Sequence, residues 1–121
     1  MDFQRVVGEI AWRDQVAAEK LGAGNIVDHT SGEWIVNRTG HKGWLYFSAT
    51  SLVFIADMPI FGQHRDTNDR IFTNTYSAMG GVVGKLFKAP IAPNAMITFG
   101  NRVEIMGAKR QMKVLYELAN R

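Results

Sequence analysis

Residues 43–56 read GWLYFSATSLVFIA, and this stretch decides the fold. It contains two runs of aromatic and β-branched residues, 44–48 and 51–56, joined by Ala49-Thr50. Such side chains pack well on a pleated surface. The short connection between them predicts a β-hairpin. We therefore expect an antiparallel sheet at the centre of the protein.

Other segments of the chain show the same period of two. Residues 95–99 and 102–106 predict a second hairpin, since Gly100-Asn101 suits a tight two-residue turn. Residues 32–36 and 71–76 predict further strands. Residues 38–43 predict a turn between strands, and residues 58–70 predict a polar loop.

Two amphipathic helices are predicted, one at each end of the chain. The first runs from residue 2 to about 21 and is stopped by Gly22 and Gly24. The second runs from 108 to about 120. Its apolar face consists of Met112, Leu115, Tyr116 and Ala119, and Lys109, Arg110, Lys113 and Glu117 lie off that face.

The order of these elements resembles the pleckstrin-homology-like superfamily, especially its GRAM and bacterial PH branches. Residues 43–54 resemble a glycine, strand, short turn and Leu-Val-Phe strand signature, and residues 96–105 with the helix that follows resemble the last hairpin and closing helix. The resemblance implies an α+β fold, a bent antiparallel β-barrel closed by the C-terminal helix. Residues 1–24 would be an added N-terminal helix, and residues 25–121 one compact PH-like domain.

Composition limits the class of protein. The 121 residues fit one domain, and the absence of cysteine excludes disulfides and thiolate chemistry. The longest apolar run found, residues 52–56, is far shorter than the roughly 20 residues that span a bilayer. We therefore expect no transmembrane segment. We expect a cytoplasmic location, which includes a protein bound peripherally to a membrane.

Charge is distributed unevenly along the chain. Residues 1–60 carry five basic and seven acidic side chains, whereas residues 61–121 carry nine basic and four acidic ones. Basic charge gathered in one half favours an anionic partner such as lipid headgroups, nucleic acid or an acidic protein. A solvated surface with chance asymmetry is the alternative.

Catalytic motifs are scarce. Gly80 and Gly84 have the wrong spacing for a phosphate-binding loop, and Leu86 follows Lys85 where such a loop has Ser or Thr. His64-Arg65-Asp66 with Asp69 could hold a metal, but a solvated loop explains this cluster as well. We therefore predict a non-enzymatic protein with no cofactor and no metal site.

Residues 81–88 are the first candidate binding surface. If they formed a short helical turn, Val82, Val83, Leu86 and Phe87 would share one side, and Lys85 and Lys88 would point away. Apolar side chains flanked by lysines suit insertion into anionic headgroups. The site predicted here is Lys85, Leu86, Phe87 and Lys88. Packing in the core or against a second copy is the alternative.

The turn before residue 43 is the second candidate surface. By resemblance to lipid-binding PH domains, Arg38 and Lys42 occupy the hairpin loop that contacts inositol phosphates. An ordinary exposed turn is the alternative interpretation.

These observations favour a binding module that docks on an anionic membrane surface or a protein partner, or that assembles with itself. In a homo-oligomer the N-terminal helix, around Trp12, would hold the protomers together. A nucleic-acid-binding protein is the main alternative, with stacking on bases by Tyr76, Phe87 or Phe99. A third is a small-molecule-binding α+β domain, with a pocket among Trp34, Trp44 and Tyr46.

Overall fold

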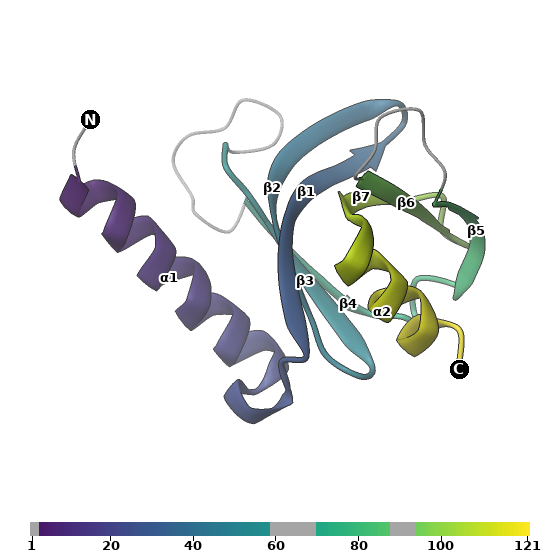
Figure 1. The fold of residues 1–121 in the computed structure, drawn as a ribbon, viewed down its shortest axis with the longest axis horizontal. Helices are drawn as coiled ribbons and strands as arrows, with labels where there is room; N and C mark the ends of the chain where they lie inside the picture. The colour runs from purple at the N-terminus through teal and green to yellow at the C-terminus, as the bar shows by residue number, and fades with distance from the viewer. Residues whose placement is uncertain (1–2, 59–69, 88–93) are drawn as a thin grey trace.

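Seven strands and two α-helices form the fold in the computed structural model, which describes residues 3–58, 70–87 and 94–121 (Figure 1). The elements follow in the order α1 (Phe3–Leu21), a short 3₁₀ helix (Ala23–Asn25), β1 (Asp28–Val36), β2 (Thr39–Phe47), β3 (Ser51–Ala56), β4 (Ile71–Thr75), β5 (Val82–Leu86), β6 (Asn94–Phe99), β7 (Glu104–Ala108) and α2 (Lys109–Ala119). Both predicted helices and both predicted hairpins are present.

All seven strands belong to one antiparallel sheet with the order β4-β3-β2-β1-β7-β6-β5. The sheet curls, and α2 lies within its concave side (Figure 1). Strand β1 joins the two halves because it pairs with β2 along its whole length and with β7 at residues 32–35. This α+β arrangement, a curled antiparallel half-barrel with a helix at each end of the chain, confirms the fold class expected from the sequence and is consistent with a PH-like fold.

Three glycines lie side by side where the sheet bends. Gly32 of β1 is the register partner of both Gly43 on β2 and Gly107 on β7. A Cβ atom on Gly32 would overlap the carbonyl oxygen of Met106, and one on Gly43 would overlap that of Ile55. Only residues without a side chain allow the neighbouring backbones to approach this closely. The glycine row therefore permits the bend.

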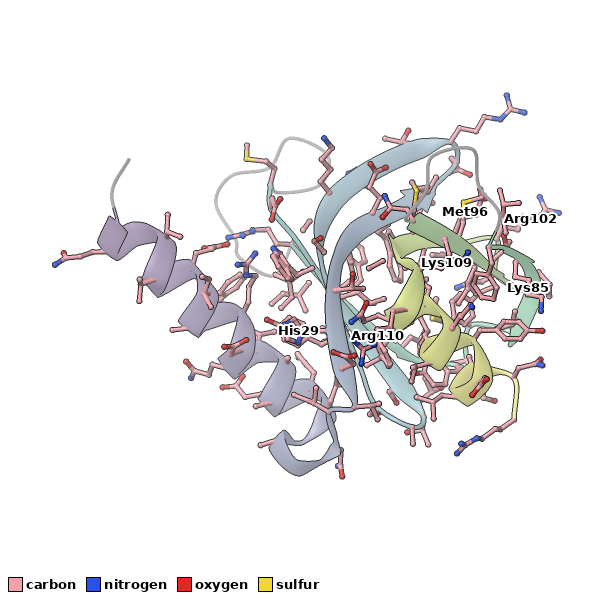
Figure 2. The ribbon with its side chains drawn as sticks, in the orientation of Figure 1. His29, Lys85, Met96, Arg102, Lys109 and Arg110 are labelled. Carbon is pink, nitrogen blue, oxygen red and sulfur yellow. The ribbon has the colours of Figure 1, made fainter. Side chains whose placement is uncertain are left out.

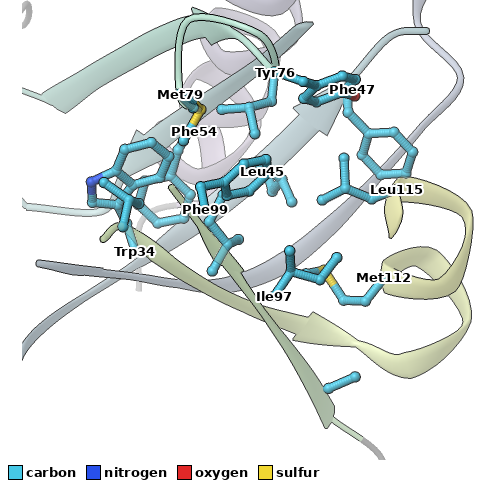
Figure 3. Packing of buried hydrophobic residues seen from close by; sticks show 14 of the residues in the cluster. Trp34, Leu45, Phe47, Phe54, Tyr76, Met79, Ile97, Phe99, Met112 and Leu115 are labelled. Carbon is cyan, nitrogen blue, oxygen red and sulfur yellow. The ribbon is translucent and has the colours of Figure 1, made fainter. Parts of the chain in front are cut away.

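The main core fills the concave side of the sheet (Figure 3). Aromatic and aliphatic side chains from five strands and the 76–79 turn meet Met112 and Leu115, the fully buried residues of α2. Alternation along β3 places Leu52 and Phe54 in this core, and Val53 and Ile55 on the opposite face. Helix α2 closes the barrel because its apolar stripe completes this core.

Helix α1 packs on the outer face of the same sheet and forms a separate core. Val16, Ala17 and Leu21 of α1 meet a second apolar surface formed by Tyr46, Val53 and Ile55. The Tyr46 hydroxyl donates a hydrogen bond of 2.7 Å to Asp14 on α1. The central strands are therefore buried on both faces, which explains why residues 52–56 form an uninterrupted apolar run.

The β1–β2 turn and the β6–β7 turn differ in detail from the sequence predictions. The turn predicted at residues 38–43 is wrong, because Thr39 already pairs with Val36 and residues 39–43 belong to β2. The turn is Asn37-Arg38, with φ values of 51° and 67°, as a type I′ turn requires. In the β6–β7 hairpin the turn includes Arg102, which has a φ of 71°. The Phe99 N–H donates a hydrogen bond to the Val103 carbonyl across this turn. It is a three-residue turn, because the third residue takes the left-handed conformation.

Two buried tyrosines lead to a prediction about alkaline pH. The Tyr76 hydroxyl donates to the Ser48 carbonyl at 2.6 Å, and burial raises the pKa of Tyr76. Burial and the bond to Asp14 also raise the pKa of Tyr46. The folded state favours the neutral phenols, so their contribution to stability is complete below about pH 10 and is lost as pH rises above it.

We therefore expect that at least two of the three tyrosines ionise only as the chain unfolds. Ultraviolet titration of tyrosinate, followed together with circular dichroism, tests this. Reversible ionisation of all three at about pH 10 in the folded protein would contradict it.

Candidate functional site

The segment predicted as a membrane-inserting helical turn is a β-strand. Residues 82–86 form β5, an edge strand that pairs with β6 and has a register shift between Val82 and Gly84. The helical prediction was wrong because pairing with β6 supplies the hydrogen bonds that a short isolated turn lacks. Lys85 pairs with Ile97 on the concave face, and Leu86 pairs with Met96 on the outer face. Lys85 and Leu86 therefore lie on opposite faces of the sheet.

Lys85 lies against two aromatic rings on the concave side. Its Nζ is 4.3 Å from the centre of the Tyr116 ring on α2 and 5.6 Å from the centre of the Phe87 ring. Phe87 packs edge-to-face on Tyr116, with ring centres 5.7 Å apart, and lies against the barrel core. Phe87 is thus an anchor for the segment and is not free to insert into a membrane. Cation–π contact holds Lys85 at the junction of β5 and α2.

Two more lysines lie on the same flank of α2. Lys109, Lys113 and Tyr116 are spaced i, i+4 and i+7, which places them on one side of the helix. Figure 2 shows Lys109 on the side of α2 toward Lys85, whereas Arg110 points to the other side. Lys85 of β5 therefore contacts Tyr116 on the flank of α2 that also carries Lys109 and Lys113. We call these three lysines the lysine cluster.

The lysine cluster has no acidic counterpart among the described residues. The salt bridges that this part of the chain forms are Arg13–Asp57, His29–Asp28 and Arg70–Glu9, and none includes a cluster lysine. Helix α2 also begins with Lys109 and Arg110, has no acidic residue in its first turn, and has no side-chain cap at Ala108. Cations at a helix N-terminus oppose the helix dipole. Lys109 and Arg110 therefore do not stabilise the N-terminus of α2, which is consistent with a role of these cations in binding.

The second predicted surface does not form one cationic site. Arg38 is at the tip of the β1–β2 turn, and Lys42 is on the outer face of β2, opposite Glu33 on β1. Lys42 lines a shallow hollow of about 240 Å³ together with Glu33, Asp57 and Trp44. Two carboxylates accompany one ammonium group there, so this hollow does not favour a strongly anionic headgroup. Four strand positions, about 13 Å, separate Arg38 from Lys42.

Some predicted residues lie outside the described part of the chain. Lys88 belongs to the segment 88–93, and the cluster His64, Arg65, Asp66 and Asp69 belongs to the segment 59–69. Both remain predictions from the sequence.

The residues proposed for stacking on nucleic-acid bases are not available for it. Tyr76 is 5% exposed and Phe99 is completely buried, with their rings stacked on each other in the core. Phe87 packs on Tyr116. The sequence alone does not say which face of a strand is covered, so it could not exclude stacking by a residue such as Phe99.

The pocket proposed among three aromatic residues is also absent. Trp34 belongs to the barrel core, where its ring stacks against both Phe54 and Phe72. Trp44 and Tyr46 project from the opposite face of the sheet toward α1. A different hollow, of about 740 Å³, lies at one end of the barrel and is lined in part by Thr50, Tyr76, Ser77, Leu118 and Arg121.

Sequence reasoning did not assign Lys109, Lys113 and Tyr116 to a site. Their spacing along one flank of a predicted helix was visible, and Lys109 and Lys113 were recognised as lying off its apolar face. No sequence signal linked that flank to Lys85, because the contact depends on how α2 is set against β5.

Comparison with known proteins gives a fold relative and no assigned family. No protein-family model matches the chain, and no curated protein matches it. A similar solved structure is the C-terminal domain of an unknown protein from Leishmania infantum, with a TM-score of 0.57 and 11% sequence identity. The match covers 90% of this chain and 96% of that one. It supports the fold alone. Within the described residues, no helix is both long and apolar enough to cross a membrane.

Proposed function

We propose that this protein is a non-enzymatic PH-like binding module that docks on an anionic membrane surface through the lysine cluster. The observation that carries the proposal is the contact of Lys85 with Tyr116 on the helix flank that also carries Lys109 and Lys113, with no salt bridge from these lysines among the described residues. Unpaired ammonium groups on one surface attract negatively charged headgroups.

The edge strand beside the cluster favours a membrane over a soluble acidic protein. Val83 is 66% exposed and Leu86 is 44% exposed, both on β5. Apolar side chains on an edge strand, next to lysines, suit contact with the boundary between headgroups and acyl chains. Leu86 thus keeps part of the role predicted from the sequence, while Lys85 supplies charge from the concave side.

Neutralising the lysine cluster is expected to abolish most vesicle binding. Each lysine near an anionic surface contributes about 1 kcal/mol, so replacing Lys85, Lys109 and Lys113 by Gln should weaken binding on the order of 100-fold. Co-sedimentation with phosphatidylcholine vesicles that contain phosphatidylserine measures the effect. Wild-type binding should also fall as salt is raised, because exposed charges are screened.

A matched variant separates a specific surface from net charge. Replacing Lys20, Arg38 and Lys42 by Gln removes the same charge from α1 and the β1–β2 hairpin, and it should reduce binding much less. Equal loss in both variants would contradict the role of the lysine cluster. Binding of an acidic polypeptide but not of vesicles would point to a protein partner, and preferential binding of single-stranded oligonucleotides would point to nucleic acid.

A further inference from the structure

The attachment of α1 differs from that of every other described element. The barrel core contains residues of the sheet, the 76–79 turn and α2, and none of α1. Helix α1 contributes to a second cluster on the outer face that shares no buried residue with the first. The concave core is therefore complete without α1, and the two regions can open independently as far as their apolar packing is concerned.

The contact surface of α1 contains a poorly compensated charge. Arg13 is 9% exposed, and its Nε has no hydrogen-bond partner among the described residues. Its guanidinium lies 4.7 Å from the centre of the Trp44 ring, and its Nη1 is 3.8 Å from Asp57. That separation exceeds a hydrogen bond. A buried charge with so few partners opposes docking of the helix.

The apolar stripe of α1 is longer than the sheet surface that receives it. Val6, Ile10 and Ala17 lie on one side of the helix at i, i+4 and i+11. Ala17 is completely buried, whereas Val6 is 40% exposed and Ile10 is 45% exposed. In Figure 1 the N-terminal half of α1 extends away from the strands. Docking therefore buries only part of the stripe, and the helix gains less than its length would allow.

The connection from α1 to β1 is short and exposed. Gly22 has a φ of 87°, and the following residues 23–25 are exposed. Polar contacts also hold α1 along its length. These contacts are the Tyr46–Asp14 hydrogen bond and the Glu9–Arg70 ion pair. The Arg70 guanidinium also lies 4.7 Å from the centre of the Trp12 ring.

We propose that α1 is a releasable cover that leaves the outer face of β2 and β3 while the barrel stays folded. Release uncovers Trp44, Tyr46, Val53 and Ile55, the surface that α1 buries. The inference is independent of the lysine cluster, which lies on the other side of the sheet.

Amide hydrogen exchange of the full chain, read by mass spectrometry, tests this proposal. The docked half of α1, residues 12–21, should exchange at least tenfold faster than β2 and β3 after correction for intrinsic rates. Val16→Ala removes packing in the outer cluster alone and should accelerate exchange of α1 on the order of tenfold. Exchange of residues in the barrel core, such as those of β6 and β7, should stay unchanged.

A second variant changes the same equilibrium in the other direction. Arg13→Met replaces the buried charge by an apolar side chain, and Asp57, with a side chain 54% exposed, can return to water. Exchange of α1 should slow at least fivefold. Equal exchange rates in α1 and the barrel would overturn the proposal, as would equal responses of both regions to Val16→Ala. Lys20→Met, on the exposed side of α1, serves as the control and should change neither rate.

Discussion

A Gly32→Ala protein is expected not to reach the native fold, or to lose more than about 4 kcal/mol of stability. A methyl group at this position would overlap the carbonyl oxygen of Met106 on β7. The atom in conflict belongs to the backbone, so no side-chain rotation relieves the overlap. Relief requires β1 and β7 to separate, and their pairing joins the two halves of the sheet. Urea denaturation followed by circular dichroism measures the loss.

Gly8→Ala is the matched control, since it adds the same methyl group in open space on α1. Alanine is a better helix former than glycine, so this change should be neutral or should stabilise by up to about 1 kcal/mol. If Gly32→Ala unfolded at the same urea concentration as the wild type, the tight approach of β1 and β7 would be contradicted.

Shortening Leu115 tests whether α2 closes the barrel. Leu115 is completely buried in the main core, and Leu115→Ala should cost about 2–5 kcal/mol through lost burial and the cavity left behind. The same helix carries Lys109 and Lys113, so loosening it should also weaken vesicle binding. Thermal unfolding measures the loss of stability, and co-sedimentation, performed well below the lowered melting temperature, measures the loss of binding.

The neighbouring residue supplies the control for this prediction. Val114 is 37% exposed, and Val114→Ala removes a similar apolar group from the surface of α2. It should cost less than about 1 kcal/mol and leave binding unchanged. Similar losses from both variants would mean that α2 is not fixed by its buried face.

Much of the fold was predictable because local signals agree with the tertiary structure. The hairpin at residues 44–56 follows from aromatic and β-branched residues on both sides of Ala49-Thr50. The C-terminal helix follows from the spacing of Met112 and Leu115, which are the residues it buries. In both segments the spacing of the apolar side chains matches the face that the fold buries, so the sequence alone predicts the element and its buried face.

The candidate site was predictable only in part. Lys85 was identified, but the period was taken as helical, and this grouped Leu86 and Phe87 on one side. Pairing with β6 placed Phe87 on the core and Leu86 on the opposite face. A five-residue strand with a bulge carries too short a pattern to separate a period of two from a helical period.

The sequence by itself determined the two terminal helices, the two hairpins and the buried face of α2, because these depend on neighbours within a few positions along the chain. Only the tertiary structure decided that Gly32, Gly43 and Gly107 form one row, and that Lys85 meets the flank of α2 at Tyr116. The bend and the lysine cluster both depend on contacts between strands and helices far apart in the sequence, and local patterns carry no record of those distances.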